Sequence, residues 1–359
     1  MAGELLVYGS YGYTGELITD AATERGLDPT VAGRDAAAVE QQATELGLAH
    51  RVFGLDYPGV VCDAVADADA VLNCAGPFAA TTEPLVRACL ATGTDYLDLT
   101  GELDVIEWVA ERDREAERAG VSLLPGVGFD VAATDCLAAY LESQLRSATR
   151  LTLAIDGFGS ASPGTMKSMI RGLPRGGAVR RNGVVTDVPP AWRTREFDFG
   201  DGPALAATVP WGDVSSAYYT TGIPNIDVYA AMPRAAVRAL RWSAPLLPLF
   251  AAGPVQSALT AVVDAAVSGP TDRERAKGTV RIHGEVADDA GNRVAARLAT
   301  PDPYDLTTET AVAAAERTLS GDAPDGFGTP ASAFGADFVL DVDGVRRLVT
   351  DAERAPAAR

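Results

Sequence analysis

The fold is decided by the first stretch of the chain, Leu5-Leu6-Val7-Tyr8-Gly9-Ser10-Tyr11-Gly12-Tyr13-Thr14-Gly15-Glu16-Leu17-Ile18. A short apolar run predicts a strand, and apolar residues at helical spacing after the glycine-rich turn predict a helix that ends at Gly26. In such a turn Gly9 permits a sharp exit from the strand, and Gly12 keeps a side chain out of the turn. Gly15 lets the helix pack closely on the strand.

A glycine turn in this setting is typical of sites that bind the pyrophosphate of a dinucleotide. The first N–H groups of the helix lack intrahelical partners, and the helix dipole favours an anion there. The glycine run alone is weak evidence, because glycine accounts for 36 of the 359 residues. Its place at the start of a long alternation of strands and helices favours a dinucleotide site over a merely structural turn. The predicted contacts are Gly9, Ser10, Tyr11, Gly12, Tyr13, Thr14 and Gly15.

The composition excludes several classes of protein. The chain has 49 acidic and 30 basic residues, a net charge of −19, which argues against a nucleic-acid partner. The acids are scattered, which favours a surface adapted to concentrated salt. The 4 cysteines are widely spaced and the 2 histidines are isolated, so no metal site is predicted. The first strand begins at once, with no signal peptide, and a cytoplasmic protein is expected.

Up to residue 148 the pattern predicts six strands alternating with helices, a doubly wound parallel sheet of the Rossmann type. The end of the second strand decides which nicotinamide cofactor fits, because an arginine there accommodates a 2′-phosphate. Arg34 occupies that place and Asp35 is placed to cap the next helix, so NADP is favoured over NAD. Asp56, after the third strand, either accepts from an adenine amino group or caps the helix that Pro58 begins.

Two later strand ends add candidate site residues. Small residues at Cys74-Ala75-Gly76-Pro77 leave room for a ribose in the crevice at the carboxyl ends of the strands. A strand at 121–124 leads into Gly128-Phe129-Asp130 and a helix over 131–145, and a single surface helix is predicted over 104–119. The further predicted cofactor contacts are Asp56, Cys74, Ala75, Gly76, Pro77, Asp98, Gly128 and Phe129.

Beyond Arg150 the pattern changes to hairpins with few crossover helices, which predicts a mixed or antiparallel sheet. The expected units are a Rossmann domain over 1–148 and a substrate and dimerisation domain over 149–305. Residues 306–350 are expected to pack back on the first domain, and 351–359 to fray. A strand over 151–158 is expected to begin the second domain.

The apolar stretch 239–255 is broken by three prolines and cannot form one straight membrane-spanning helix. One interpretation is a buried or dimer-interface segment. The other is an apolar lid that faces a lipid-like substrate or makes peripheral contact with a membrane.

The chain resembles the saccharopine dehydrogenase-like oxidoreductases, in particular the branch of trans-acting enoyl reductases and uncharacterised reductases. The resemblance rests on motifs that occur in the family's order over nearly the whole length. They are 9–15, Ala32-Gly33-Arg34, 73–78, 96–102, 126–130, 164–168 and Thr329-Pro330. Ala132-Ala133-Thr134-Asp135 departs from the family, which often has proline before the corresponding aspartate.

The resemblance implies a Rossmann domain that holds NADP(H), an inserted mixed-sheet domain over the nicotinamide, and a C-terminal segment that returns to the first domain. By matching positions, the glycine turn would hold the pyrophosphate, Arg34 the 2′-phosphate and Ala75-Gly76-Pro77 the nicotinamide side. The turn Gly128-Phe129-Asp130 would lie where cofactor meets substrate.

Hydride transfer by a nicotinamide needs a protein group that supplies a proton or polarises the substrate. The candidates are Asp130, Thr165 and Lys167, with Asp98 also considered. An NADP-dependent reductase of C=C or C=N bonds in a lipid-like small molecule is expected, as a homodimer. Two alternatives stay open: a non-catalytic NADP(H)-binding sensor, and an amino-acid imine reductase with Arg171, Arg175 and Arg180 converging on its pocket.

Overall fold

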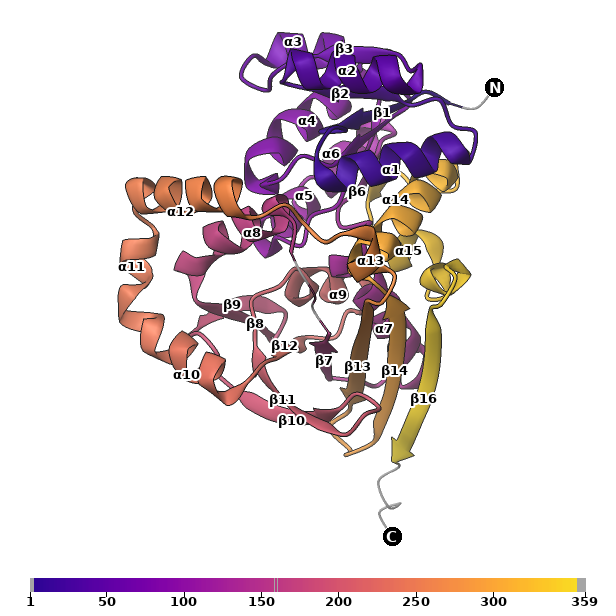
Figure 1. Ribbon diagram of the computed structural model, residues 1–359. Coiled ribbons are helices and arrows are strands. Elements are labelled where there is room, and N and C mark those ends of the chain that lie inside the picture. The colour runs from indigo at the N-terminus through magenta and orange to yellow at the C-terminus, as the bar shows by residue number, and fades with distance from the viewer. Residues whose placement is uncertain (1–2, 158, 160, 354–359) are drawn as a thin grey trace.

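The computed structural model describes residues 3–157, 159 and 161–353 of the chain. A parallel sheet with helices on both faces forms the upper half of the molecule, and a mixed sheet forms the lower half (Figure 1). This arrangement confirms the predicted fold class of a Rossmann domain, an inserted mixed-sheet domain and a returning C-terminal segment.

The first sheet has seven strands in the order β15-β6-β5-β4-β1-β2-β3, and every pair within it is parallel. The order reverses between β1 and β4, which is where open parallel sheets bind their ligands. The sequence predicts the third strand over 50–55 and the fourth over 68–73, and both are shorter in the structure. The strands are β1 (Leu5–Tyr8), β2 (Thr30–Gly33), β3 (His50–Val52), β4 (Ala70–Asn73), β5 (Asp95–Asp98), β6 (Ser122–Leu124) and β15 (Gly326–Phe327).

Side-chain alternation along each strand builds the layers on the two faces. In β1, Leu5 and Val7 join the core shared with α1 and α14, whereas Leu6 and Tyr8 join the core shared with α3 and α4. The helices of this domain are α1 (Tyr13–Glu24), α2 (Ala36–Leu46), α3 (Pro58–Val65), α4 (Phe78–Thr92), α5 (Leu103–Ala110) and α6 (Asp113–Ala119).

The single helix predicted over 104–119 was wrong, because the structure breaks it after Ala110. The second piece begins at Asp113, whose carboxylate accepts a hydrogen bond of 2.9 Å from the backbone N–H of Phe327 in β15. A long-range contact with the edge strand therefore accompanies the break, and the local helical pattern contains no sign of it.

The second sheet has the order β10-β11-β12-β7-β13-β14-β16, and β8 joins it beside β12. Hairpin β13–β14 forms as predicted, whereas β8, β10 and helix α9 (Asp213–Thr221) were missed. Phe158, the predicted end of the first strand here, lies outside the described residues. The strands are β7 (Arg150–Asp156), β8 (Gly177–Arg181), β9 (Val184–Val188), β10 (Thr194–Asp198), β11 (Pro203–Thr208), β12 (Asn225–Ala231), β13 (Thr279–Ala287), β14 (Arg293–Pro301) and β16 (Arg346–Glu353).

Helix α7 (Phe129–Gln144) joins the two halves, because it leaves β6 of the first sheet and packs on β13 and β14 of the second. Gly284 in β13 makes this packing close. A Cβ atom at Gly284 would lie 2.5 Å from Cδ1 of Leu141 and 3.0 Å from Cδ2 of Leu137. Both leucines are fully buried and belong to one core that continues into both sheets.

The C-terminal segment returns to both sheets. Helix α14 (Pro303–Leu319) packs on α1, and β15 extends the first sheet beside β6. The expectation of a frayed tail from residue 351 was wrong for 351–353, since β16 pairs with β14 through Glu353. Two short elements follow β15 and precede β16 along the chain. They are helix α15 (Pro330–Phe334) and the 3-10 turn Phe338–Asp341, and both pack on α7.

The apolar stretch 239–255 lies within an arm at the side of the second sheet, drawn in orange in Figure 1. The arm contains α10 (Arg234–Ser243), the 3-10 turn Ala244–Leu246, α11 (Leu247–Phe250) and α12 (Gly253–Ala266). Within the described residues no single helix is long and apolar enough to cross a bilayer. Segments 234–250 and 253–263 meet that criterion only together, and they are bent by 114° at the break.

Replacing Leu141 by alanine should destabilise the protein by about 2–5 kcal/mol, because it empties the contact between α7 and Gly284. Denaturant unfolding at constant salt measures the loss. The matched control is Leu246→Ala, which truncates an exposed leucine and should leave the unfolding midpoint nearly unchanged. Equal midpoints for the two variants would contradict the role assigned to this contact.

Candidate functional site

The glycine turn after β1 is folded against the turn after β4. Gly9 has a positive φ of 80°, and a Cβ atom there would lie 2.7 Å from Cβ of Ala75. A Cβ atom at Gly15 would overlap the carbonyl oxygen of Gly9. Both positions therefore require glycine so that the two turns and helix α1 can approach one another.

Gly12 has a different reason to be glycine, because only the Gly9 carbonyl oxygen lies within 4 Å of its Cβ position, at 3.3 Å. It is exposed, and it is the N-cap residue of α1, where no side chain makes a capping hydrogen bond. The first N–H groups of α1 have no intrahelical acceptor, so this helix start can accept an anion. The open, uncapped turn fits the pyrophosphate of a dinucleotide.

Two side chains predicted to contact the cofactor point elsewhere. The Ser10 hydroxyl is buried and donates to Oε1 of Gln42 at 2.6 Å, so it holds the turn against α2. The Tyr13 hydroxyl donates to the carbonyl of Pro270 at 2.6 Å and accepts from Arg275. The prediction that these side chains contact the cofactor is therefore corrected. Only the backbone of Ser10 and Tyr13 is left to contact a bound cofactor. Tyr11 and Thr14 are half-buried beside them.

The end of β2 presents Arg34 to solvent, and no acidic side chain of the described residues lies within salt-bridge distance of it. Next to it, the ring of Tyr11 covers Gly33, where a Cβ atom would overlap the ring. Asp35 caps α2 as predicted, accepting from Ala38 N–H at 3.2 Å. An exposed guanidinium at the end of the second strand suits the 2′-phosphate of NADP.

Asp56 is exposed after β3, and it does not cap helix α3. The N-cap residue of that helix is Tyr57, with no capping side-chain hydrogen bond. The structure therefore does not show Asp56 as a helix cap. Its contact with an adenine amino group stays a prediction.

The turn after β4 is fixed by hydrogen bonds on both sides. Cys74 N–H donates to the carbonyl of Tyr8 at 2.8 Å, and Ala75 N–H donates to Oδ1 of Asn73 at 3.0 Å. The hydroxyl of Thr81 donates to the carbonyl of Ala75 at 2.7 Å. Gly76 is left exposed, and Pro77 follows it as the N-cap residue of α4. The turn is built of small residues held by these hydrogen bonds, and its contact with the nicotinamide side of a cofactor stays a prediction.

Glu102 is a further positioning residue that the sequence analysis missed. Its carboxylate accepts from the N–H groups of Phe78 and Ala79 at 2.9 and 3.0 Å, and from the hydroxyl of Ser168 at 2.7 Å. It therefore satisfies the start of α4 and ties the turn after β4 to helix α8 (Pro163–Gly172). The signal was present in Thr100-Gly101-Glu102, which the sequence analysis used only as a family motif.

Asp98 does not belong to the cofactor surface, which corrects the prediction. Its fully buried carboxylate accepts from the N–H groups of Thr100 and Gly126 at 2.9 and 3.0 Å, and from the hydroxyl of Tyr96 at 2.9 Å. Burial raises the pKa of Asp98 to about 6 despite these donors. It holds together the turns that follow β5 and β6.

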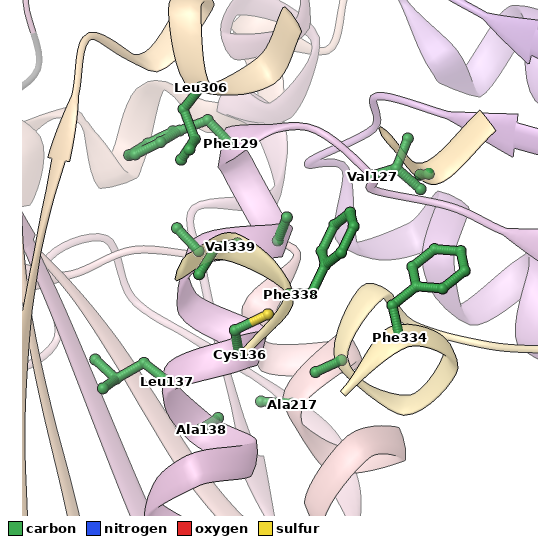
Figure 2. Packing of buried hydrophobic residues seen from close by; sticks show 14 of the residues in the cluster. Val127, Phe129, Cys136, Leu137, Ala138, Ala217, Leu306, Phe334, Phe338 and Val339 are labelled. Atoms are coloured by element: carbon green, nitrogen blue, oxygen red, sulfur yellow. The ribbon is translucent and has the colours of Figure 1, made fainter. Parts of the chain in front are cut away.

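Gly128 and Phe129 are also turned away from the crevice, contrary to prediction. Phe129 is buried in the core with Leu306 of α14 (Figure 2). Its N–H donates to the hydroxyl of Thr307 at 3.0 Å, and a Cβ atom at Gly128 would lie 3.0 Å from Cγ2 of the same threonine. Helix α14 thus covers these two residues, which explains why small and apolar residues occur there.

Asp130 is the exception in this motif, because its side chain is open to solvent. A Cβ atom at Gly101 would lie 2.8 Å from Oδ2 of Asp130, so this carboxyl group rests on the backbone after β5. Desolvation by the surrounding protein raises the pKa of Asp130 to about 6. A carboxyl group with such a pKa at the carboxyl edge of the sheet can act as a proton donor near neutral pH.

Two buried acids lie close to Asp130. The pKa of Asp213 is raised to about 7, mainly by desolvation and to a smaller extent by the charges of Asp130 and Asp135. Burial also raises the pKa of Asp135 to about 6, although Thr220 and the N–H of Ala331 donate to its carboxylate. The sequence analysis missed Asp213, because α9 was not predicted.

The other two predicted catalytic residues lie on α8. The Thr165 hydroxyl is 3.1 Å from that of Ser162 and 3.2 Å from that of Tyr304, so it belongs to the contact between α8 and α14. Lys167 is half-buried one residue before Ser168. The structure brings α8 to the Gly76 turn through Ser168 and Glu102.

The three arginines proposed for an imine reductase do not converge on one site. Arg180 is buried, pairs with Glu107 and donates to the carbonyls of Val214 and Gly183. Arg175 pairs with Asp104 and Asp187, and Arg171 is exposed.

Comparison with known proteins identifies the first domain. Residues 5–124 match the model of the saccharopine dehydrogenase NADP binding domain. The amino-terminal domain belongs to this family. The resemblance to saccharopine dehydrogenase-like oxidoreductases is thereby confirmed, and binding of NADP by this domain is supported.

Two curated relatives and one solved structure illustrate the similarity. The chain is 29% identical over 216 residues to the saccharopine dehydrogenase-like oxidoreductase of Rattus norvegicus, covering 52% of this chain and 50% of the relative. It is 31% identical over 144 residues to the trans-acting enoyl reductase of Mycobacterium leprae, covering 37% of this chain and 34% of the relative. The matched region thus spans half or less of these relatives.

Apo saccharopine dehydrogenase (L-Glu forming) from Saccharomyces cerevisiae has the same fold, with a TM-score of 0.66 at 12% identity over 97% of this chain and 100% of that chain. The relatives that the chain matches are named oxidoreductases, and residues 5–124 match the model of an NADP binding domain.

Gly12→Ala should weaken NADPH binding by about tenfold or more, because the new methyl group occupies the anion position at the start of α1. The fold should tolerate it, since the Gly12 φ of −78° suits alanine. The matched variant Gly15→Ala should instead lower the melting temperature, because its Cβ overlaps Gly9. Fluorescence titration and thermal unfolding of both variants separate the two effects. Unchanged NADPH affinity in Gly12→Ala would refute the anion site.

Arg34→Ser should lower affinity for NADPH by about 10- to 100-fold, because a charge-assisted hydrogen bond to the 2′-phosphate is lost. Affinity for NADH, which lacks that phosphate, should stay the same and serves as the internal control. Calorimetric titration of both cofactors into both proteins measures the ratio. Parallel losses for the two cofactors would show that Arg34 does not read the 2′-phosphate.

Proposed function

We propose that the chain is an NADP-dependent oxidoreductase that reduces a C=C or C=N bond of an apolar small molecule, with Asp130 as the proton donor. The observation that carries the proposal is Asp130, exposed on Gly101 at the carboxyl edge of a sheet whose first turn is open to a dinucleotide. The bound nicotinamide supplies hydride, and the protein must hold the cofactor, orient the substrate and deliver a proton.

The residues that would hold NADP follow one edge of the first sheet. The start of α1 at Gly12 binds the pyrophosphate, Arg34 binds the 2′-phosphate, and the turn Ala75-Gly76-Pro77 takes the nicotinamide side. Supporting this assignment, Glu102 fixes the last turn through Phe78 and Ala79 and ties it to α8. A rigid turn keeps the site organised before substrate arrives.

Asp130 supplies the proton that hydride transfer to a double bond requires. The proton passes from its carboxyl group to the substrate atom next to the one that receives hydride. The resulting carboxylate recovers a proton from water, because the side chain is open to solvent. Desolvation by the surrounding protein favours the neutral form of the Asp130 carboxyl group.

The preference for an apolar substrate rests on the arginines. Arg175 and Arg180 are neutralised by acidic partners, so neither is available to bind a substrate carboxylate. The name of the mycobacterial relative, trans-acting enoyl reductase, supports reduction of a C=C bond. We therefore place the enoyl or isoprenoid type of substrate before the amino-acid imine.

The second candidate function is a sensor that binds NADP(H) without turnover. The solvent-exposed position of Asp130 favours this function unless a substrate covers it. NADPH oxidation in the presence of short trans-2-enoyl thioesters distinguishes the two. Substrate-dependent loss of NADPH supports the reductase, and tight binding without loss supports the sensor.

Asp130→Asn should lower kcat by about 100-fold or more while NADPH affinity stays within a factor of two or so, because only proton delivery is lost. In the wild type the rate should fall as pH rises through about 6, since the pKa of Asp130 is raised to about 6 and the acid form is the donor. The variant should lack this descending limb.

Asp343→Asn, which changes an exposed acid before β16, is the control and should leave both rate and pH profile unchanged. A wild-type rate that rises through pH 6, or an Asp130→Asn variant with normal kcat, would contradict the assignment of the donor.

A further inference from the structure

The arm formed by α10, α11 and α12 is anchored on its inner side. Val237 and Leu240 pack into a small core with Ala191 and Ala207 of the second domain. The Gln256 side chain donates to the carbonyl of Ile170 in α8 at 3.0 Å. The arm is therefore an ordered part of the fold with a fixed outer face.

The outer face of the arm is apolar. Trp242 is 84% exposed, the highest value among the exposed large apolar side chains of the described residues. Leu246 and Leu249 follow at 50% and 56%, and Val262 on α12 at 63%. A soluble chain rarely leaves several large apolar side chains together on one exposed element unless that element has a partner.

The geometry of α10 separates the anchored side from the free side. At 100° per residue, Val237 and Leu240 define the inward direction, and Trp242 lies nearly opposite to them. Arg234, Arg238 and Arg241 lie on one stripe between these two sides, and Arg238 is the nearest of the three to the Trp242 direction. Tryptophan with arginine beside it is typical of helices that lie in the interface of a membrane.

The charge of the arm is opposite to that of the rest of the chain. Residues 228–263 contain three arginines and no acidic residue, in a chain whose net charge is −19. At physiological ionic strength charges beyond about 8 Å are screened, so a surface touching the arm experiences the arginines more than the acidic body. Arg234 pairs with Glu196 of β10 at 3.4 Å, and Arg241 donates to the carbonyl of Ala191 at 3.0 Å. The exposed Arg238 therefore carries the charge that complements an anionic surface.

We propose that the arm docks on the surface of an anionic lipid bilayer, with Trp242, Leu246 and Leu249 inserted at the headgroup level and Arg238 among the lipid phosphates. The bend of 114° between the two segments places the arm along a surface rather than across a bilayer. The proposal stands on the arm alone and does not depend on the reaction assigned to Asp130.

A second copy of the chain fits this face less well. A two-fold dimer sets the same patch against itself. Arg238 of one arm would then lie on the same interface as Arg238 of the other, whereas an anionic bilayer compensates this charge.

The arm is also connected to the proposed site. Helix α12 holds α8, and Ser168 of α8 donates to Glu102 at the turn after β4. Beyond α12, the carbonyl of Pro270 accepts from Tyr13 of the glycine turn.

Flotation of the wild-type protein with vesicles tests the proposal. We expect co-flotation with vesicles of phosphatidylcholine and phosphatidylglycerol at equal weight in 0.15 M KCl, and at least about tenfold less with phosphatidylcholine alone. The partition coefficient of the variant Trp242→Ser/Leu246→Ser/Leu249→Ser on the mixed vesicles should be at least about tenfold lower than that of the wild type. Val184→Ser, at an exposed valine of β9, is the matched control and should float like the wild type.

Arg238→Ser, a single change at an exposed residue, should lower binding to the mixed vesicles only and keeps the test decisive if the triple variant does not fold. NADPH titration of each variant confirms an intact first domain. Absence of the wild type from the floating fraction would overturn the proposal, as would equal flotation of wild type and variants. A wild-type dimer that the arm variants convert to a monomer, without lipid binding, would assign the face to self-association and overturn it as well.

Discussion

The architecture depends on one close approach, that of Gly9 to Ala75 at the point where the strand order of the first sheet reverses. Side chains at Gly9 or Gly15 would force apart the turns after β1 and β4 and the start of α1. Because these backbones touch, the uncapped helix start and the rigid Ala75–Pro77 turn lie on the same edge of the sheet. Every role assigned to a cofactor-binding residue follows from that placement.

The second domain is attached to this edge by contacts that also complete the site. Tyr13 reaches from the glycine turn to Pro270, and Glu102 reaches Ser168. Helix α7 starts at the carboxyl end of β6, exposes Asp130 there and then packs on Gly284 of the mixed sheet. The same helix thus transmits the position of the second sheet to the proposed proton donor. Desolvation by the surrounding protein is the main cause of the raised pKa values of Asp130, Asp135 and Asp213 in this region.

Much of the first domain could be predicted from the sequence, because its strands are short apolar runs and its turns carry glycine. The roles of individual side chains could not. Ser10, Tyr13 and Phe129 lie in cofactor motifs, yet their side chains contact Gln42, Pro270 and the α14 core. These partners are distant in sequence, and no local pattern contains them. The missed Asp213 and the broken helix at Ala110 have the same cause, since tertiary contacts determine them.

The central claim is that the first domain binds NADP through the glycine turn and distinguishes it from NAD. Calorimetric titration of the wild-type protein with NADPH and with NADH, in the same concentrated-salt buffer, tests this most directly. The account predicts one bound NADPH per chain and at least about tenfold weaker binding of NADH. Binding of neither cofactor, or tighter binding of NADH, would contradict it.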